Sequence, residues 1–295
     1  VGKFTFLAKR ILYSKPNDAI ITFADLRASL NAYINKQPET VGLYFEYLPT
    51  GTSIGINSND EFYRASLVKL PVVMRAYKYI EAGQLSLDEE LTVEQVQLNP
   101  DYGTLWKRGA GTKLTVRELI HLILTESDNT AFNVLYEKVN VQLRKGTRTG
   151  DQSSDDIYDY LDIPRLTNDI TPMISPKNYT SILKSLYFSS YLTYEDSNAI
   201  LTTMTEAHPE KWLRSGIPDS VKVADKIGVN TASPTKNYVY SDCGLVYFPN
   251  RPYSLCLMVN TDDQTKAVPI IQDVSRMVYD YIKAQPGGCD CNVDK

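Results

Sequence analysis

Ser66 and Lys69 are the first pair of side chains in this chain whose types and spacing could carry out covalent chemistry. A separation of three residues places both side chains on one face of a helix. A serine hydroxyl is a poor nucleophile at neutral pH, and a lysine can serve as its base only where burial or a nearby cation destabilises the ammonium form. At a helix N-terminus the serine also lies among backbone N–H groups that suit an oxyanion. The pair is therefore a candidate nucleophile and base.

The serine-lysine spacing recurs at two other places in the chain, so it does not identify a site alone. Two further motifs follow it in the sequence. Residues Ser127–Asn129 read Ser-Asp-Asn at the junction of two predicted helices, and Lys226–Gly228 read Lys-Ile-Gly at the end of a predicted strand. Taken singly, the first is an ordinary helix cap and the second a solvated lysine before a turn. The three motifs in this order are a more specific signal than any one of them alone.

The chain offers few residues for chemistry that depends on histidine, because His121 and His208 are its only two histidines. His121 lies among apolar residues of a predicted helix, which favours a packed, hydrogen-bonded imidazole over a catalytic one. His208 precedes a proline and is predicted to lie in a loop. A zinc site built on histidine and a serine-histidine-aspartate triad are both disfavoured.

The four cysteines form two pairs with different settings. Cys243 and Cys256 lie in two apolar, β-rich runs joined by a turn, so buried thiols and a disulfide are both open. Cys289 and Cys291 lie in a terminal tail with no metal-ligand partner nearby. The sequence predicts no metal and no cofactor.

Length, charge and hydropathy set the broad class. The chain has 295 residues, 43% of them hydrophobic, and a net charge of −4. It can bury a substantial core in one large or two closely associated domains. The mild acidity argues against a nucleic-acid partner, and no apolar run approaches the roughly 18 residues that span a bilayer. We expect a globular monomer whose partner is a small molecule or a peptide.

Hydrophobic periodicity predicts the elements that position these residues. Helices are expected at both ends of the chain and in its middle, over 23–36, 67–80, 116–124, 179–186 and 267–282. Strands are expected over 41–47, 53–56, 221–224, 238–240, 243–248 and 253–259. The polar stretch 142–156 is predicted to be an exposed loop.

This order of elements predicts an antiparallel sheet made from both chain ends, with a helical domain inserted between them. The predicted organisation is an N-terminal extension (1–22), a discontinuous sheet domain (23–65 and 216–284), a helical domain (66–215) and a flexible tail (285–295).

The three motifs, in the order S-x-x-K, S-D-N and K-x-G, resemble those of the penicillin-recognising serine hydrolases. The likeness runs from about residue 23 to residue 282 and is strongest to class A β-lactamases and low-molecular-mass penicillin-binding proteins. Residues 114–119, 127–131 and 223–226 carry it most closely. The resemblance implies an α/β (α+β) fold of the β-lactamase/transpeptidase type. Such a fold has about five antiparallel strands, flanking terminal helices, an inserted all-helical domain and a cleft.

The resemblance also implies catalytic roles. Ser66 would be the acylated nucleophile, Lys69 its proton acceptor, and Ser127 the proton donor to the leaving nitrogen. Lys226 would tune Ser127 electrostatically. The backbone N–H groups of Ser66 and Val229 would form the oxyanion hole.

Substrate-binding roles would fall on Asn129, Tyr102, Ile227 and Gly228. Asn129 would hydrogen-bond the amide side chain of the substrate, and Tyr102 is either an aromatic at the cleft rim or one more of 21 tyrosines. Ile227 stands where the family has a hydroxyl that helps hold the substrate carboxylate, a loss of about 1.5–3 kcal/mol. Either Arg214 or another cation compensates, or the natural ligand is a different ester or amide.

A second departure concerns deacylation. Class A β-lactamases carry a glutamate that activates the deacylating water, and residues 160–172, where we look for it, contain none. Asp159 comes near the place in an ungapped count, but its side chain is shorter. Asp162 and Asp169 are expected to be solvated or capping residues. Glu126 adjoins Ser127 but points elsewhere, so it is not assigned as the base.

Three hypotheses follow. The first is an acyl-serine hydrolase that forms an acyl-enzyme at Ser66 with β-lactam-like, peptide or ester substrates and deacylates lactams poorly. The second is a class A-type β-lactamase that turns antibiotics over. The third, favoured by Ile227, is a non-catalytic module that binds a peptide or cell-wall fragment. The resemblance implies an extracytoplasmic setting, with room for a membrane anchor upstream of this chain.

Overall fold

The computed structural model describes Phe6 and residues 21–142, 155–163, 173–207, 212–231 and 238–285. Most of the predicted extension 1–22 and tail 285–295 lies outside these residues. The chain divides into two compact units. We call residues 1–7, 64–173 and 185–209 the helical unit, and residues 8–63, 174–184 and 210–295 the sheet unit. The domain boundaries drawn from the sequence remain a prediction; here residues 174–184 group with the sheet.

Five strands build the main sheet of the sheet unit, as the resemblance implies. They are β1 (Thr40–Tyr47), β2 (Thr52–Ile56), β7 (Val223–Asn230), β8 (Val239–Val246) and β9 (Tyr253–Asn260). Their order is β2-β1-β9-β8-β7, and all neighbouring pairs are antiparallel. The central strand β9 is buried along all but its last residue, which explains its nearly continuous apolar run.

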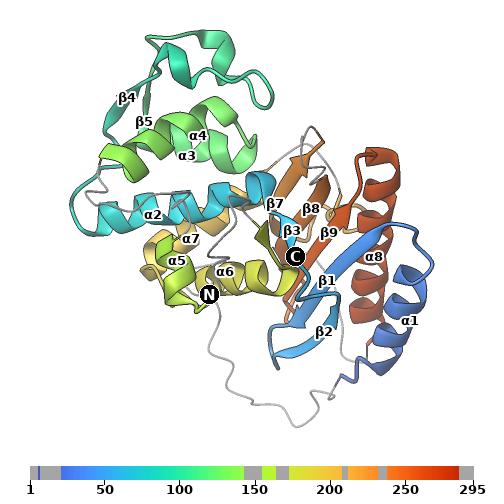
Figure 1. Ribbon diagram of the computed structural model, residues 1–295. Helices are drawn as coiled ribbons and strands as arrows, with labels where there is room; N and C mark the ends of the chain where they lie inside the picture. The colour runs from blue at the N-terminus through green and yellow to red at the C-terminus, as the bar shows by residue number, and fades with distance from the viewer. Residues whose placement is uncertain are drawn as a thin grey trace. The chain divides into compact units, whose positions relative to one another are not determined.

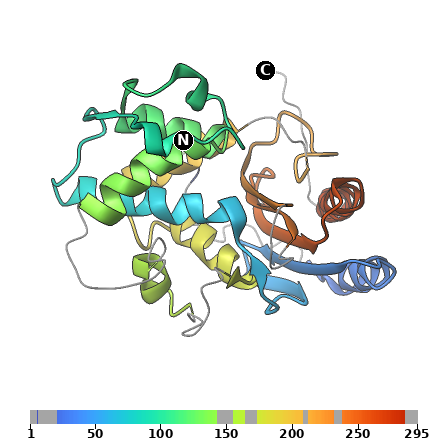
Figure 2. The same cartoon turned by 45° about the horizontal axis from the view of Figure 1, so that its top comes forward.

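Two terminal helices, α1 (Ala24–Ile34) and α8 (Gln264–Ala284), lie on one face of this sheet (Figure 1; Figure 2). The buried residues of α8 recur every three or four positions and form a single stripe, which includes Ala267, Ile271, Val274, Val278 and Ile282. With the strands and α1 they make the apolar core of the sheet unit. The predicted helix over 267–282 is therefore confirmed.

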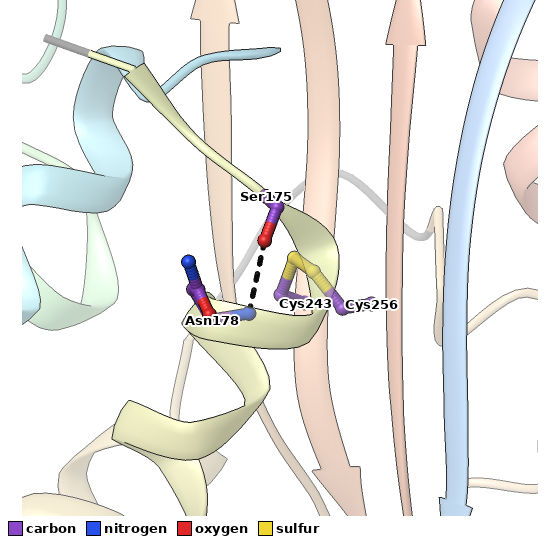
Figure 3. Close-up of a disulfide and its surroundings, with 4 residues drawn as sticks. All are labelled: Ser175, Asn178, Cys243 and Cys256. Atoms are coloured by element: carbon purple, nitrogen blue, oxygen red, sulfur yellow. Dashed lines mark hydrogen bonds between the residues drawn. A yellow bond between two sulfur atoms is a disulfide. The ribbon is translucent and has the colours of Figure 1, made fainter. Parts of the chain in front are cut away.

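Helix α6 (Pro176–Tyr187) begins where the sequence places a proline. Proline suits the first helical position because its missing N–H would have no partner there. The Ser175 hydroxyl accepts a hydrogen bond of 3.2 Å from the Asn178 backbone N–H, which satisfies another free donor at the same end (Figure 3).

A disulfide joins Cys243 of β8 to Cys256 of β9 (Figure 3). The two residues face each other directly in the β8–β9 register, their Cα atoms are 3.9 Å apart, and both are fully buried. The alternative that the sequence left open is thereby decided in favour of a disulfide. The predicted tail cysteines, Cys289 and Cys291, lie outside the described residues.

Helices dominate the helical unit. They are α2 (Lys69–Glu81), α3 (Val116–Thr125), α4 (Asn129–Tyr136), α5 (Asp155–Tyr160) and α7 (Tyr194–Thr205). Short turns are η1 (Ala65–Val68), η2 (Gln95–Gln97), η3 (Leu105–Arg108) and the π-helical η4 (Glu137–Gln142). Strands β4 (Glu90–Thr92) and β5 (Lys113–Thr115) form a small sheet. Of the two-residue strands, β3 (Phe62–Tyr63) belongs to the sheet unit, and the two residues of β6 (Met173–Ile174) are divided between the units.

Local chemistry fixes the start of α3. The Thr115 hydroxyl accepts a bond from the Glu118 N–H at 3.2 Å, and the Glu118 carboxylate accepts one from the Thr115 N–H at 2.7 Å. This reciprocal capping box satisfies two free donors, and it lowers the pKa of Glu118.

Two predictions about strands were wrong. The strand expected over 221–224 begins at Val223 and continues to Asn230, and the runs 238–240 and 243–248 form the single strand β8. Charged and glycine residues interrupt the apolar alternation of β7, but pairing with β8 along its full length holds it extended. The expected loop 142–156 has helical residues at both ends, and residues 143–154 lie outside the described chain.

Candidate active site

Ser66 lies in the 3-10 turn η1, and α2 begins three residues later at Lys69. The sequence placed Ser66 at the opening of the α-helix itself; the turn and helix run together, so both side chains still share a face. Ala65, just before the serine, has φ of 45°. This left-handed conformation is costly for a residue with a Cβ, and such strain gathers at functional sites.

The Lys69 ammonium connects the first two motifs. Its Nζ donates to the Ser127 backbone carbonyl at 2.6 Å, to Asn129 Oδ1 at 2.6 Å and to Ser127 Oγ at 3.1 Å. All three acceptors are neutral oxygens. The Lys69 side chain is only 2% exposed and also lies 5.8 Å from the centre of the Phe132 ring. The structure thus brings Lys69, Ser127 and Asn129 together from segments almost 60 residues apart.

Asp128, the middle residue of the second motif, has a structural role. It is fully buried and caps α4, with Oδ1 accepting from the Ala131 N–H at 2.8 Å. Its Oδ2 accepts from the Thr104 and Leu105 N–H groups at 2.7 and 2.8 Å. One carboxylate therefore ties the loop before η3 to the start of α4. Sequence reasoning anticipated the cap but not the loop.

The same loop requires a glycine. Gly103 has φ of 85°, and a Cβ at this position would lie 2.2 Å from Asp128 Oδ2. Tyr102 beside it is half-buried, and its carbonyl accepts from the Asn129 N–H at 3.1 Å. The predicted rim tyrosine is thereby placed next to Asn129. Glu126 accepts from the Thr104 hydroxyl at 3.0 Å.

The third motif lies within β7 of the sheet unit. Lys226 is 2% exposed and its Nζ donates to the Ile227 carbonyl at 3.0 Å, so the reading of a solvated lysine at a strand end is wrong. Ile227 and Val229 pack against the apolar core of this unit. Because successive strand residues point to opposite faces, Lys226 points away from that core. The apolar side chain of Ile227 fits the face on which it lies.

Arg214 is held inside the sheet unit. Its Nε and Nη2 donate to Asp225 Oδ1 at 2.8 and 2.5 Å, and Nη2 also donates to the Val223 carbonyl at 2.8 Å. The suggestion that Arg214 compensates for the missing hydroxyl at position 227 is therefore disfavoured, because its guanidinium neutralises a buried carboxylate instead.

Asp242 lies close to this ion pair. It is fully buried, and its Oδ2 accepts from the Leu213 N–H at 2.9 Å. Its Oδ1 has no hydrogen-bond partner among the described residues. Burial, reinforced by the charge of Asp225, raises the pKa of Asp242 well above its usual range.

The other candidates are peripheral. His121 was expected to be packed and hydrogen-bonded. Its Nε2 is hydrogen-bonded to Glu206 Oε2 at 3.2 Å, but the side chain is 53% exposed, so the packing was predicted wrongly: the residue lies on the solvent side of α3. Asp159 and Asp162 are both exposed. Asp169 and His208 lie outside the described residues.

Two features are absent from the part of the chain that the structure describes. No group of three or more histidine, cysteine, aspartate or glutamate side chains is placed there to hold a metal ion. No helix in that part is both long enough and apolar enough to cross a bilayer.

A five-stranded antiparallel sheet with flanking helices, together with the linked serine-lysine-serine motifs, is the arrangement of the penicillin-recognising serine hydrolases. The profile of the Beta-lactamase enzyme family matches residues 25–282. The chain belongs to this family and is a serine hydrolase.

Individual relatives agree. Beta-lactamase 3 of Bacillus cereus is 24% identical over 276 residues, which cover 88% of this chain and 80% of that protein. The structure of PBP-A has a TM-score of 0.76 at 24% identity, covering 89% of this chain and 97% of PBP-A. A PBP-A variant solved as an acyl-enzyme complex with penicillin G has a TM-score of 0.75 at 24% identity, covering 88% and 97%.

Proposed function

We propose that this protein is an active-site serine acyl hydrolase that forms an acyl-enzyme at Ser66. Its substrates would be β-lactams or acyl peptides and esters. The observation that carries the proposal is the buried Lys69 Nζ, which contacts both Ser127 and Asn129 and lies one helical turn from Ser66. The PBP-A variant trapped with penicillin G supports a β-lactam as an acylating substrate.

In the proposed acylation, Lys69 acts as a neutral amine. Once the ammonium has lost one proton, its two remaining N–H groups would serve the two acceptors at 2.6 Å, Ser127 O and Asn129 Oδ1, and the lone pair of the amine would take up the Ser66 proton. Ser66 Oγ attacks the substrate carbonyl and passes its proton to Lys69 Nζ. The carbonyl C–N bond breaks, and the leaving nitrogen takes a proton from Ser127 Oγ. Lys69, 3.1 Å from that oxygen, returns a proton to it.

The remaining roles are those that the resemblance implies. The N–H groups of Ser66 and Val229 stabilise the oxyanion, and the Lys226 ammonium assists Ser127 electrostatically. Asn129 and Tyr102 contact the acyl side chain of the substrate, and the backbone of Ile227 and Gly228 borders it. Removal of one oxyanion donor in related chemistry costs roughly 100- to 1000-fold in rate.

Deacylation is proposed to be slow, because residues 160–172 contain no glutamate to activate water. Asp159 is the nearest substitute in the sequence. It lies on α5 and is exposed, which does not suit a base that must act beside the substrate in a site closed to bulk water. Efficient turnover is the second candidate function, favoured by relatives that are β-lactamases. It would need a different base.

Time-resolved intact-protein mass spectrometry after mixing with a small excess of penicillin G tests the proposal. A lasting adduct of one drug mass is expected. A brief adduct with consumption of the drug would instead establish β-lactamase turnover. No adduct and intact drug would contradict acylation by this lactam and favour a non-catalytic peptide- or wall-binding module. Ser66→Ala should abolish the adduct, and Lys69→Ala should nearly do so.

An extracytoplasmic setting also belongs to the proposal. The Cys243–Cys256 disulfide supports it, because disulfides persist mainly in oxidising compartments. Secretion or an anchor outside this sequence would serve equally well. The monomeric state remains a prediction.

A further inference from the structure

Asn99, which none of the three motifs includes, contacts the Asn129 amide. Asn99 lies in the segment between η2 and η3, and its side chain is half-buried. Its Oδ1 accepts from the Asn129 Nδ2 at 3.2 Å. The opposite end of the Asn129 amide, Oδ1, is the atom that receives the Lys69 Nζ. Asn99 and Lys69 thus contact the two ends of one amide.

A backbone donor fixes which atom of Asn99 faces Asn129. The Asp101 N–H donates to Asn99 Oδ1 at 2.9 Å in an Asx turn, and a backbone N–H can only donate. The atom it meets must therefore be the oxygen of Asn99. The Asn129 atom that meets the same oxygen must in turn be the donor nitrogen. Asn129 Oδ1 is left facing Lys69, where an acceptor is required.

The Asn99 backbone is anchored to α4. Its N–H donates to the Thr130 hydroxyl at 2.9 Å, and that hydroxyl lies 3.3 Å from the Asn99 carbonyl, to which it donates. Thr130 is fully buried and directly follows Asn129. Pro100 restricts Asn99 to extended backbone conformations. The position of the Asn99 oxygen is therefore set before any substrate arrives.

We propose that Asn99 is a positioning residue that sets the orientation of the Asn129 amide. With Asn99 in place, the amide oxygen faces Lys69 and the second N–H of Nδ2 remains available to a substrate acyl group. Without it, the amide can reverse and present an N–H to Lys69, which opposes the donors of the ammonium form or occupies the lone pair that the neutral amine needs for the Ser66 proton. The proposal rests on the proposed acyl-enzyme chemistry, and it adds to that chemistry a residue outside the three motifs.

The test is a double-mutant cycle on the second-order rate constant of acylation by penicillin G. Asn99→Leu should lower this rate constant about two- to tenfold, the range expected for losing one hydrogen bond. Asn99→Asp should retain it, because a carboxylate oxygen still accepts from both N–H groups. In an Asn129→Ala background, Asn99→Leu should have no further effect.

The matched control is Asn133→Leu. Asn133 Nδ2 donates to the Gln97 carbonyl at 2.9 Å, so this variant loosens the same segment without touching Asn129. Its acylation rate should stay within twofold of wild type. The positioning role would be overturned if Asn99→Leu lowered the acylation rate constant by the same factor in the wild-type and Asn129→Ala backgrounds. It would also be overturned if Asn133→Leu lowered that rate constant as much as Asn99→Leu does.

Urea unfolding of the four proteins of the cycle (wild type, Asn99→Leu, Asn129→Ala and the double variant) separates this inference from the proposed function. Coupling between Asn99 and Asn129 in the free energy of unfolding is expected even if penicillin G does not acylate the wild type, in which case only the proposed function fails. Absence of that coupling would overturn the inference itself.

Discussion

The Asp128 carboxylate is the contact on which the helical part of the site most depends, and Asp128→Ala should measure its contribution. The substitution removes the α4 cap, worth about 1 kcal/mol. It also removes the acceptor of two further N–H groups, Thr104 and Leu105. Leu105 is 1% exposed, so its N–H would be left without water or partner, and a hydrogen bond to a charged group is worth about 1.5–3 kcal/mol.

Removing the buried charge also removes its desolvation cost, which offsets part of the loss. We therefore expect the free energy of unfolding to fall by about 3 kcal/mol, measured from the urea midpoint at unchanged m-value. Asp128→Asn retains one acceptor oxygen and should lose about half as much. The acylation rate should also fall, because the loop that contains Thr104 and Tyr102 would no longer be held beside Asn129.

Asp101→Ala is the matched control, because Asp101 carries the same charge in the same loop and its side chain is exposed. A surface change of this kind should alter stability by less than about 0.5 kcal/mol. If Asp128→Ala proved as mild as Asp101→Ala, the idea that this carboxylate organises the loop would be refuted.

Two further predictions concern the sheet unit. Replacing both Cys243 and Cys256 by alanine opens a loop with a sequence separation of 13 and should lower the free energy of unfolding by about 2–4 kcal/mol; an unchanged urea midpoint would contradict the disulfide. The pKa of Asp242 is raised in the folded state, so the native protein retains a proton that the unfolded chain loses above about pH 4. The contribution of this group to the free energy of unfolding therefore falls as pH rises. The slope is up to about 1.4 kcal/mol per pH unit, until the pH exceeds the folded pKa. Asp242→Asn should flatten this dependence and make the protein more stable than wild type at pH 8; parallel pH profiles of the two proteins would show that Asp242 is not the group responsible.

Much of the fold could be predicted from the sequence, because its signals are local. The stripe of α8 and the apolar run of β9 follow directly from burial on one face or on both faces. The shared helical face of Ser66 and Lys69 follows from their spacing, and the order of the three motifs distinguishes this pair from the other two with the same spacing. These features depend on the identity of neighbours in the chain, which sequence reasoning can use.

What sequence reasoning missed depends on partners far along the chain. The extent of β7 is set by pairing with β8. The burial of Lys226 likewise has no signal among its neighbours in the sequence. The Cys243–Cys256 bond depends on a strand register that composition cannot specify. Asn99 gave no motif signal, although an asparagine before a proline is a recognisable turn former.

The most direct test of the central claim is to locate the acyl group. Trypsin cleaves after Arg64 and Lys69 and releases the peptide Ala65–Lys69, in which Ser66 is the only hydroxyl-bearing residue. After reaction with penicillin G and digestion, mass spectrometry should find one drug mass on this peptide, or on the longer peptide if acylation slows cleavage. It should find none there in Ser66→Ala. An adduct confined to any other peptide would contradict the assignment of Ser66 as the nucleophile.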